Sequence, residues 1–194
     1  MQEPETRTVV LDVAQELIQT RGYNAFSFRD VAERVGIKTA SIHYHFPTKT
    51  DLCRAVISRQ REELAAALAR IDAEEDDANR RLARYVSVFR ATLEVGNRMC
   101  LCGMLAADAT TLDPSIVADL RSSLGDHEAW LEALLHRGEE AGVMAASGDL
   151  REEARLILSS LEGAMLLART FDDPGRFDAA ALALLSRFRK QTVG

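Results

Sequence analysis

Residues 27–52 read SFRDVAERVGIKTASIHYHFPTKTDL, and this stretch decides the fold. Ser27 and Asp30 form an S-x-x-D capping signal that begins a short helix. The small Ala32 suits a close helix crossing, and Gly36, four residues later, suits a turn with positive φ. A second short helix over 39–46 ends before Pro47. The spacing therefore predicts a helix-turn-helix, with a small core that we expect from Val31, Val35, Ile37 and Ile42.

The rest of the chain also reads as helix. Apolar residues at helical spacing, bounded by Gly, Pro and Asn, predict helices over residues 7–21, 48–71, 79–98, 101–109, 115–142, 149–172 and 177–191. No strand-like alternation of useful length interrupts them. We therefore expect an all-α protein with two parts. Residues 1–50 contain the helix-turn-helix and 51–194 contain the longer helices, with the helix at about 48–71 connecting the two parts.

Charge separates the same two parts. The 194 residues carry 24 basic and 30 acidic side chains, a net charge of −6 that by itself disfavours nucleic acid. Residues 1–60, however, hold eight basic and seven acidic side chains, so the acidity belongs to the remainder. No apolar run is long enough for a membrane helix, and the N-terminus lacks a signal-peptide core, so we expect a cytoplasmic protein. Three cysteines do not make a disulfide framework.

The second short helix supplies candidate DNA contacts. The first side chains of a recognition helix lie near base edges in the major groove, which selects Thr39, Ala40 and Ser41. Lys38, in the turn, is expected on phosphate. The exposed aromatic side chains of the segment His43-Tyr44-His45 are further candidates. An H-x-H metal site is disfavoured here, because residues two apart on a helix point away from each other.

The string from Gly36 to Leu52 resembles the signature of TetR-family transcriptional regulators, in which F-x-x-K-x-x-L opens the fourth helix. The resemblance covers about residues 7–57. It implies that residues 1–50 form a helix-turn-helix DNA-binding domain and residues 51–194 a helical effector-binding and dimerisation domain. It implies phosphate contacts for Tyr44, His45 and Lys49, and a base or phosphate contact for Arg29. One departure is His43, where the family usually has Tyr.

One short recognition helix gives little specificity, so we expect a homodimer on a palindromic operator. The last two helices are apolar, and the resemblance implies that they form a four-helix bundle with their dimer mates. Packing within one chain alone is the other interpretation. Small side chains at Ala164 and Ala168 would allow a partner helix to approach closely. The interface residues we expect are Leu156, Leu161, Met165, Ala168, Leu182, Leu185 and Phe188.

A small-molecule effector should bind in the middle part of the sequence, where we expect residues 79–145 to form its pocket. Methionine and tryptophan suit an adaptable apolar pocket, although a methionine or aromatic residue on a helix is more often plain core. The expected lining is Phe89, Leu93, Met99, Cys100, Cys102, Met104, Trp130, Leu134 and Met165.

We expect a repressor released by its effector, and three alternatives stay open. The C-x-C pair Cys100 and Cys102 near a helix start could sense oxidants or electrophiles, or both could be buried core. The protein could bind DNA constitutively, without an effector. An enzyme is disfavoured, because the sequence holds no Gly-rich phosphate loop, G-x-S-x-G or H-E-x-x-H motif. No cofactor, metal or membrane partner is expected.

Overall fold

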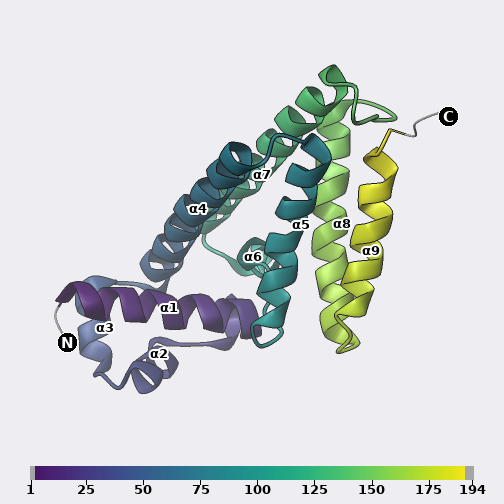
Figure 1. Cartoon of the computed structure of the whole chain (residues 1–194). Coiled ribbons are helices and arrows are strands. Elements are labelled where there is room, and N and C mark those ends of the chain that lie inside the picture. The colour runs from purple at the N-terminus through teal and green to yellow at the C-terminus, as the bar shows by residue number, and fades with distance from the viewer. Residues whose placement is uncertain (1–2, 191–194) are drawn as a thin grey trace. The chain divides into compact units, whose positions relative to one another are not determined.

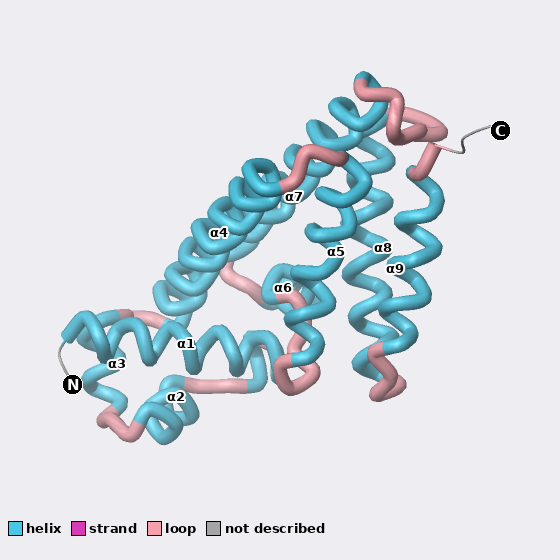
Figure 2. The backbone as a smooth tube through the Cα atoms, in the orientation of Figure 1, coloured by secondary structure: helices cyan, strands magenta, loops and turns pink. Residues whose placement is uncertain are grey.

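A computed structural model describes residues 3–190 and shows a chain built from helices (Figures 1 and 2). Within those residues no strand occurs, which confirms the all-α prediction. The α-helices are α1 (Glu3–Arg21), α2 (Phe28–Val35), α3 (Thr39–His45), α4 (Lys49–Glu74), α5 (Ala78–Glu94), α6 (Leu101–Ala107), α7 (Pro114–Glu140), α8 (Leu150–Thr170) and α9 (Gly175–Phe188), and the 3-10 helices are Tyr23–Ala25 and Ala109–Thr111.

The chain divides into two compact units that are not contiguous in sequence. The first unit comprises Met1–Glu63 and Leu101–Ser123, and the second comprises Leu64–Cys100 and Leu124–Gly194. The sequence reading placed one boundary at residue 50. In the structure the first unit also contains α6 and the beginning of α7, which sequence order alone could not assign to it.

The helix-turn-helix of the first unit forms where the capping and turn residues of the sequence predict it. The backbone N–H of Ser27 donates to Asp30 Oδ2 over 2.7 Å, which caps α2, and the backbone N–H of Thr48 donates to Asp51 Oδ2 over 3.0 Å, which caps α4. Gly36 ends α2 with φ +76°, a conformation that is cheap for glycine. The core beneath these helices includes Val31, Ala32, Ile42 and Phe46, which are all buried.

Later segments of the chain complete the first unit. Asp108, just after α6, accepts a hydrogen bond from the backbone N–H of Tyr23 over 2.8 Å. Arg54 of α4 donates to Asp119 of α7 over 2.6 Å. The turn between α1 and α2 and the start of α4 are therefore both attached to residues 101–123.

The second unit contains α5, α8, α9 and parts of α4 and α7, with α8 and α9 packed side by side (Figure 1). Apolar side chains at helical spacing face inward on both helices, and Phe177 and Phe188 are among the most deeply buried. The sequence predicted this helix from about 177, whereas α9 begins at Gly175 and ends at Phe188. The predicted end at about 191 lies outside the described residues.

Among residues 3–190, no helix is both long enough and apolar enough to cross a membrane.

Candidate nucleic-acid interface

Helix α3 has one buried face and one exposed polar face. Ile42 is completely buried and anchors the helix, whereas Ala40, Ser41 and Tyr44 are exposed. Tyr44 is 73% exposed, an unusually open position for a large aromatic side chain. A short helix that presents small, hydroxyl and phenol groups to solvent can enter a major groove.

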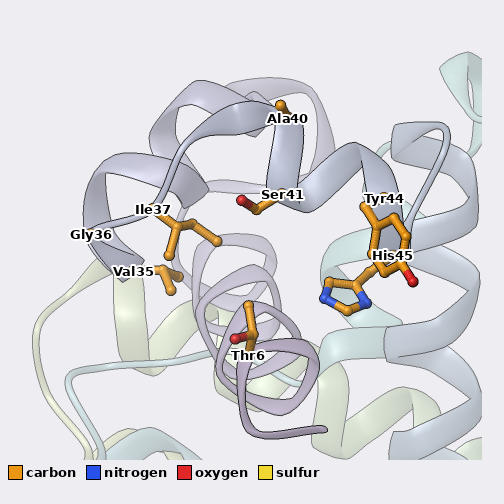
Figure 3. A pocket seen from close by; sticks show the side chains of 8 residues that line it. All are labelled: Thr6, Val35, Gly36, Ile37, Ala40, Ser41, Tyr44 and His45. Carbon is orange, nitrogen blue, oxygen red and sulfur yellow. The ribbon is translucent and has the colours of Figure 1, made fainter. Parts of the chain in front are cut away.

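A hollow of about 900 Å³ lies beside this helix in the first unit. Figure 3 shows Thr6 of α1 at the bottom of the hollow, Ser41 and His45 of α3 above and to the right, and Gly36 and Ile37 of the α2–α3 turn to the left. Hydroxyl and imidazole groups are donors suited to phosphate oxygens. The sequence reading missed Thr6, because α1 carries no signal that brings its beginning to α3. The full lining is Thr6, Val35, Gly36, Ile37, Ala40, Ser41, Tyr44 and His45.

Cationic side chains of the first unit remain available for DNA, because acidic side chains of this unit form ion pairs with other arginines. Glu16 pairs with Arg34 and Asp12 with Arg59, each at 2.6 Å. Arg29 and Lys38 are exposed, and neither forms an ion pair within residues 3–190. These two cations are therefore available for DNA, and the predicted contacts, a phosphate for Lys38 and a base or phosphate for Arg29, stay predictions.

Arg7 is a cation that the sequence reading did not single out. Its guanidinium lies over the Phe46 ring, 5.3 Å from the ring centroid, and the side chain is exposed. Stacking on Phe46 holds this charge on α1 near the end of α3. Only the fold reveals this, because the two residues are far apart in sequence.

Lys49 has a structural role that the sequence reading did not foresee. Its Nζ donates to the backbone carbonyls of Tyr23 and Phe26, each over 2.5 Å, and lies 4.3 Å from the centroids of both rings. Burial lowers the pKa of Lys49. An ammonium has three donors, so one N–H is left for the predicted phosphate contact.

His43 is partly engaged within its own module. Its Nδ1 lies 3.2 Å from the carbonyl oxygen of Pro47, and its ring packs edge-on against Phe28 with centroids 4.7 Å apart. The side chain is nonetheless exposed, so its predicted DNA contact stays a prediction alongside this packing role.

The predicted effector lining falls into both units. Phe89, Leu93, Met99, Cys100, Leu134 and Met165 are buried in the second unit, and Trp130 is half-buried there. Cys102 and Met104 belong to the first unit, where the Cys102 thiol lies 3.3 Å from Ser123 Oγ. The sequence reading missed Tyr85, His127 and Glu162, which join the aromatic residues of the second unit and are described below.

All three cysteines lie among the described residues 3–190, where each is buried and none forms a disulfide. Burial raises the pKa of the Cys53 thiol to about 12. Cys100 is buried as well, and it neighbours the carboxyl group of Glu162. These surroundings are typical of cysteines that pack in a protein core, which is the alternative to a sensing role for Cys100 and Cys102.

The structure places the predicted dimer-interface residues on different faces of their helices. Leu161, Met165, Ala168 and Phe188 are buried within one chain and pack in its own core, and their contact with a partner stays a prediction. Ala164 is buried as well, and the small side chains face the chain's own interior. Leu185 is half-buried. The large apolar side chains exposed on α8, on α9 and just after α8 are Leu156, Leu166, Leu167, Phe171 and Leu182, of which only Leu156 and Leu182 were predicted.

A capped helix-turn-helix with an exposed polar α3, joined to a separate helical body, defines the class of helix-turn-helix DNA-binding regulators. Two family models match the chain: "Bacterial regulatory proteins, tetR family" over residues 10–56 and "Tetracyclin repressor-like, C-terminal domain" over residues 78–184. The chain belongs to the TetR family of transcriptional regulators.

Relatives of known identity agree with this family. The HTH-type transcriptional repressor ComR of Escherichia coli is 28% identical over 167 residues, covering 84% of this chain and 79% of ComR. A TetR-family regulator from Agrobacterium tumefaciens is 31% identical with a TM-score of 0.94, covering 97% of this chain and 100% of that one. A TetR regulator from Legionella pneumophila is 34% identical with a TM-score of 0.86, covering 93% and 96%.

Proposed function

We propose that this protein is a cytoplasmic one-component repressor that binds a palindromic operator as a homodimer and leaves it when a small molecule binds the helical body. It acts by binding and not by catalysis. The observation that carries the proposal is the exposed face of α3, where Ser41 and the 73%-exposed Tyr44 border the hollow beside α1. In this arrangement α3 reads base edges while Thr6, Arg7 and Lys38 hold the flanking phosphates.

The exposed apolar surface of the second unit supports the dimer. On α8, residues 156, 160, 163 and 167 share one face at helical spacing, and this face includes the exposed Leu156, Gly163 and Leu167. A glycine on such a face lets another helix approach closely. On α9 the exposed Leu182 lies beside exposed alanines at 179, 180 and 183. We propose that these two faces meet their copies across a two-fold axis.

The effector signal would pass along α4. This helix runs without interruption from Lys49 in the first unit to Glu74 in the second. An effector that favours one arrangement of the second unit would thereby change the spacing of the two α3 helices in the dimer. Operator and effector binding are then reciprocally linked.

The test is binding of the purified protein to the DNA upstream of its own gene, measured by mobility shift against shuffled DNA of equal length. We expect a sequence-selective shift that weakens steeply with salt. Tyr44→Ala should weaken it about 10-fold or more, whereas His136→Ala, on an exposed position of α7, should leave it unchanged. Equal affinity for both DNAs, or for Tyr44→Ala and the parent protein, would contradict the proposal.

A further inference from the structure

A polar cluster lies inside the second unit, surrounded by aromatic rings. Its members come from separate parts of that unit: Tyr85 from α5, Cys100 from the segment before α6, His127 from α7 and Glu162 from α8. Tyr85 and His127 are 0% and 3% exposed, and the Tyr85 hydroxyl lies 2.7 Å from His127 Nδ1. This hydrogen bond fixes the imidazole ring, so the direction of Nε2 is fixed as well.

Three polar atoms of this cluster are poorly satisfied. His127 Nε2 and both carboxyl oxygens of Glu162 are shielded from solvent. Nε2 has no hydrogen-bond partner among residues 3–190, and the Glu162 carboxyl group has only the weakly hydrogen-bonding thiol of Cys100 next to it. Burying a polar group without a partner costs on the order of 1–3 kcal/mol. A carboxyl group with two such oxygens beside an imidazole is costly as core packing, and it is suited to a ligand that donates hydrogen bonds.

The surrounding rings add a second recognition element. The Trp130 ring stacks on Tyr85 with centroids 5.3 Å apart and planes 25° apart, and Phe89 meets Tyr85 edge-on, also at 5.3 Å. Trp130 Nε1 donates to Asp72 Oδ2 over 2.9 Å, which holds the indole in place. Aromatic faces are electronegative and attract cations.

The charges that act on the cluster select the sign of the ligand. Asp126 and Glu162 act on His127, and Cys100 and His127 act on Glu162, whereas no lysine or arginine contributes at either group. An anion would meet buried acid groups without a compensating cation. An ammonium group would meet a carboxylate and ring faces, which stabilise it.

We propose that Glu162, His127 and the rings of Tyr85, Phe89 and Trp130 bind a small organic cation, an ammonium group on an apolar or aromatic body. Glu162 accepts the ammonium N–H groups, and the rings contact the apolar part. The inference rests on the proposed function in taking this ligand as the effector. The binding site itself is independent of DNA.

Binding of such a cation has a proton balance. Burial, and the Cys100 thiol next to it, raise the pKa of Glu162 to about 9, so its carboxyl group is protonated at neutral pH. Burial also lowers the pKa of His127, which keeps the imidazole neutral. When an ammonium ion binds, the Glu162 O–H bond breaks, the proton leaves to buffer, and the carboxylate pairs with the cation. One proton is released for each ligand bound.

Benzylamine, which is protonated at neutral pH, is a suitable probe. Benzyl alcohol matches its size without the charge, and benzoate reverses the charge. Trp130 is the only tryptophan in the sequence, so its fluorescence reports binding at this site directly. We expect benzylamine at millimolar concentration to change this fluorescence saturably, and the other two not to do so. Calorimetry in buffers of different ionisation enthalpy should show the release of one proton.

Glu162→Gln is the decisive variant, and Glu152→Gln, at an exposed position of the same helix, is its matched control. We expect Glu162→Gln to bind benzylamine about 10- to 100-fold more weakly, without proton release, and Glu152→Gln to behave like the parent. Circular dichroism checks that both fold. Equal response to benzylamine and benzyl alcohol, equal affinity of parent and Glu162→Gln, or no response to benzylamine overturns the inference.

The two proposals can fail separately. If the protein does not select its upstream DNA, the proposed function fails, while saturable and Glu162-dependent benzylamine binding still supports the site. If the mobility shift succeeds and benzylamine does not bind, only the organic-cation site is excluded.

Discussion

Glu162 is a half-buried residue whose carboxyl oxygens are shielded from solvent. Among residues 3–190, the thiol of Cys100 is the weak hydrogen-bonding group next to this carboxyl. A glutamate at a helical position with mixed neighbours gives no sequence signal of this kind, because its surroundings come from α5, α7 and the segment before α6. Its identity as a buried acid follows from the fold alone.

Glu162 should make the stability of the protein depend on pH. Its pKa rises from the ordinary 4.5 to about 9 on folding, so between these values the folded protein holds a proton that the unfolded chain has lost. The free energy of unfolding therefore falls as pH rises, by at most about 1.4 kcal/mol per pH unit. Glu162→Gln should remove this slope, as measured by urea unfolding at several pH values.

The useful window for that measurement lies above about pH 6.5. The pKa of His127 is lowered on folding, so its contribution to stability is present above the ordinary histidine value and is lost as pH falls below it. Above that pH the difference between parent and Glu162→Gln isolates the glutamate. Parallel stability curves for the two proteins would show that Glu162 is ionised in the folded state.

At the scale of elements, the connection between α4 and the helix-turn-helix depends on Lys49. Its ammonium group joins the first residue of α4 to the carbonyls of Tyr23 and Phe26, two positions in the α1–α2 connection. A hydrogen bond to a charged group contributes about 1.5–3 kcal/mol. Lys49 therefore stabilises the contact between α4 and the α1–α2 connection. Lys38, in the α2–α3 turn, is instead available for a contact with DNA.

These two lysines should respond differently to the same substitution. Lys49→Ala should lower the free energy of unfolding by about 2 kcal/mol, since two carbonyls and two rings lose their partner. Lys38→Ala should leave stability unchanged and should lower both operator affinity and the salt dependence of binding, by one phosphate contact. Chemical denaturation measures the free energy of unfolding, and mobility shifts at several salt concentrations measure operator affinity and its salt dependence. The reverse pattern would assign the phosphate contact to Lys49.

The residues that start and end each helix can be read from the sequence, but the segments that pack against each face of a helix cannot. The Ser27–Asp30 and Thr48–Asp51 caps and the positive φ of Gly36 follow from residue types at fixed short spacing. On α8, however, two apolar faces coexist. Leu156 lies roughly 140° around the helix from Leu161, and periodicity does not say which face the chain covers itself. The predicted interface combined residues of both faces.

At the scale of the whole molecule, the exposed face of α8 and α9 decides whether the protein can read a palindrome. Leu167 and Leu182 are 55% and 68% exposed in one chain. Leu167→Glu or Leu182→Glu should convert a dimer to a monomer, because a charge buried in an apolar interface costs several kcal/mol. Light scattering measures the mass.

Val88→Glu is the control for this prediction, since Val88 is exposed on α5, outside the proposed interface. It should leave the dimer and operator binding intact. The two leucine variants should lose operator affinity together with dimerisation. A leucine variant that stays dimeric would place the interface on another surface.

The discontinuous first unit has a consequence for the exchange of parts between regulators. The segment that matches the tetR family model, residues 10–56, is held by Asp108 and Asp119, which lie far along the chain. A chimera that grafts this segment onto a foreign body loses the hydrogen bond to the Tyr23 backbone and the ion pair of Arg54. To carry its DNA specificity elsewhere, the donor must also supply residues 101–123. The DNA-binding module that can be transferred between regulators therefore consists of two segments, which must be exchanged together.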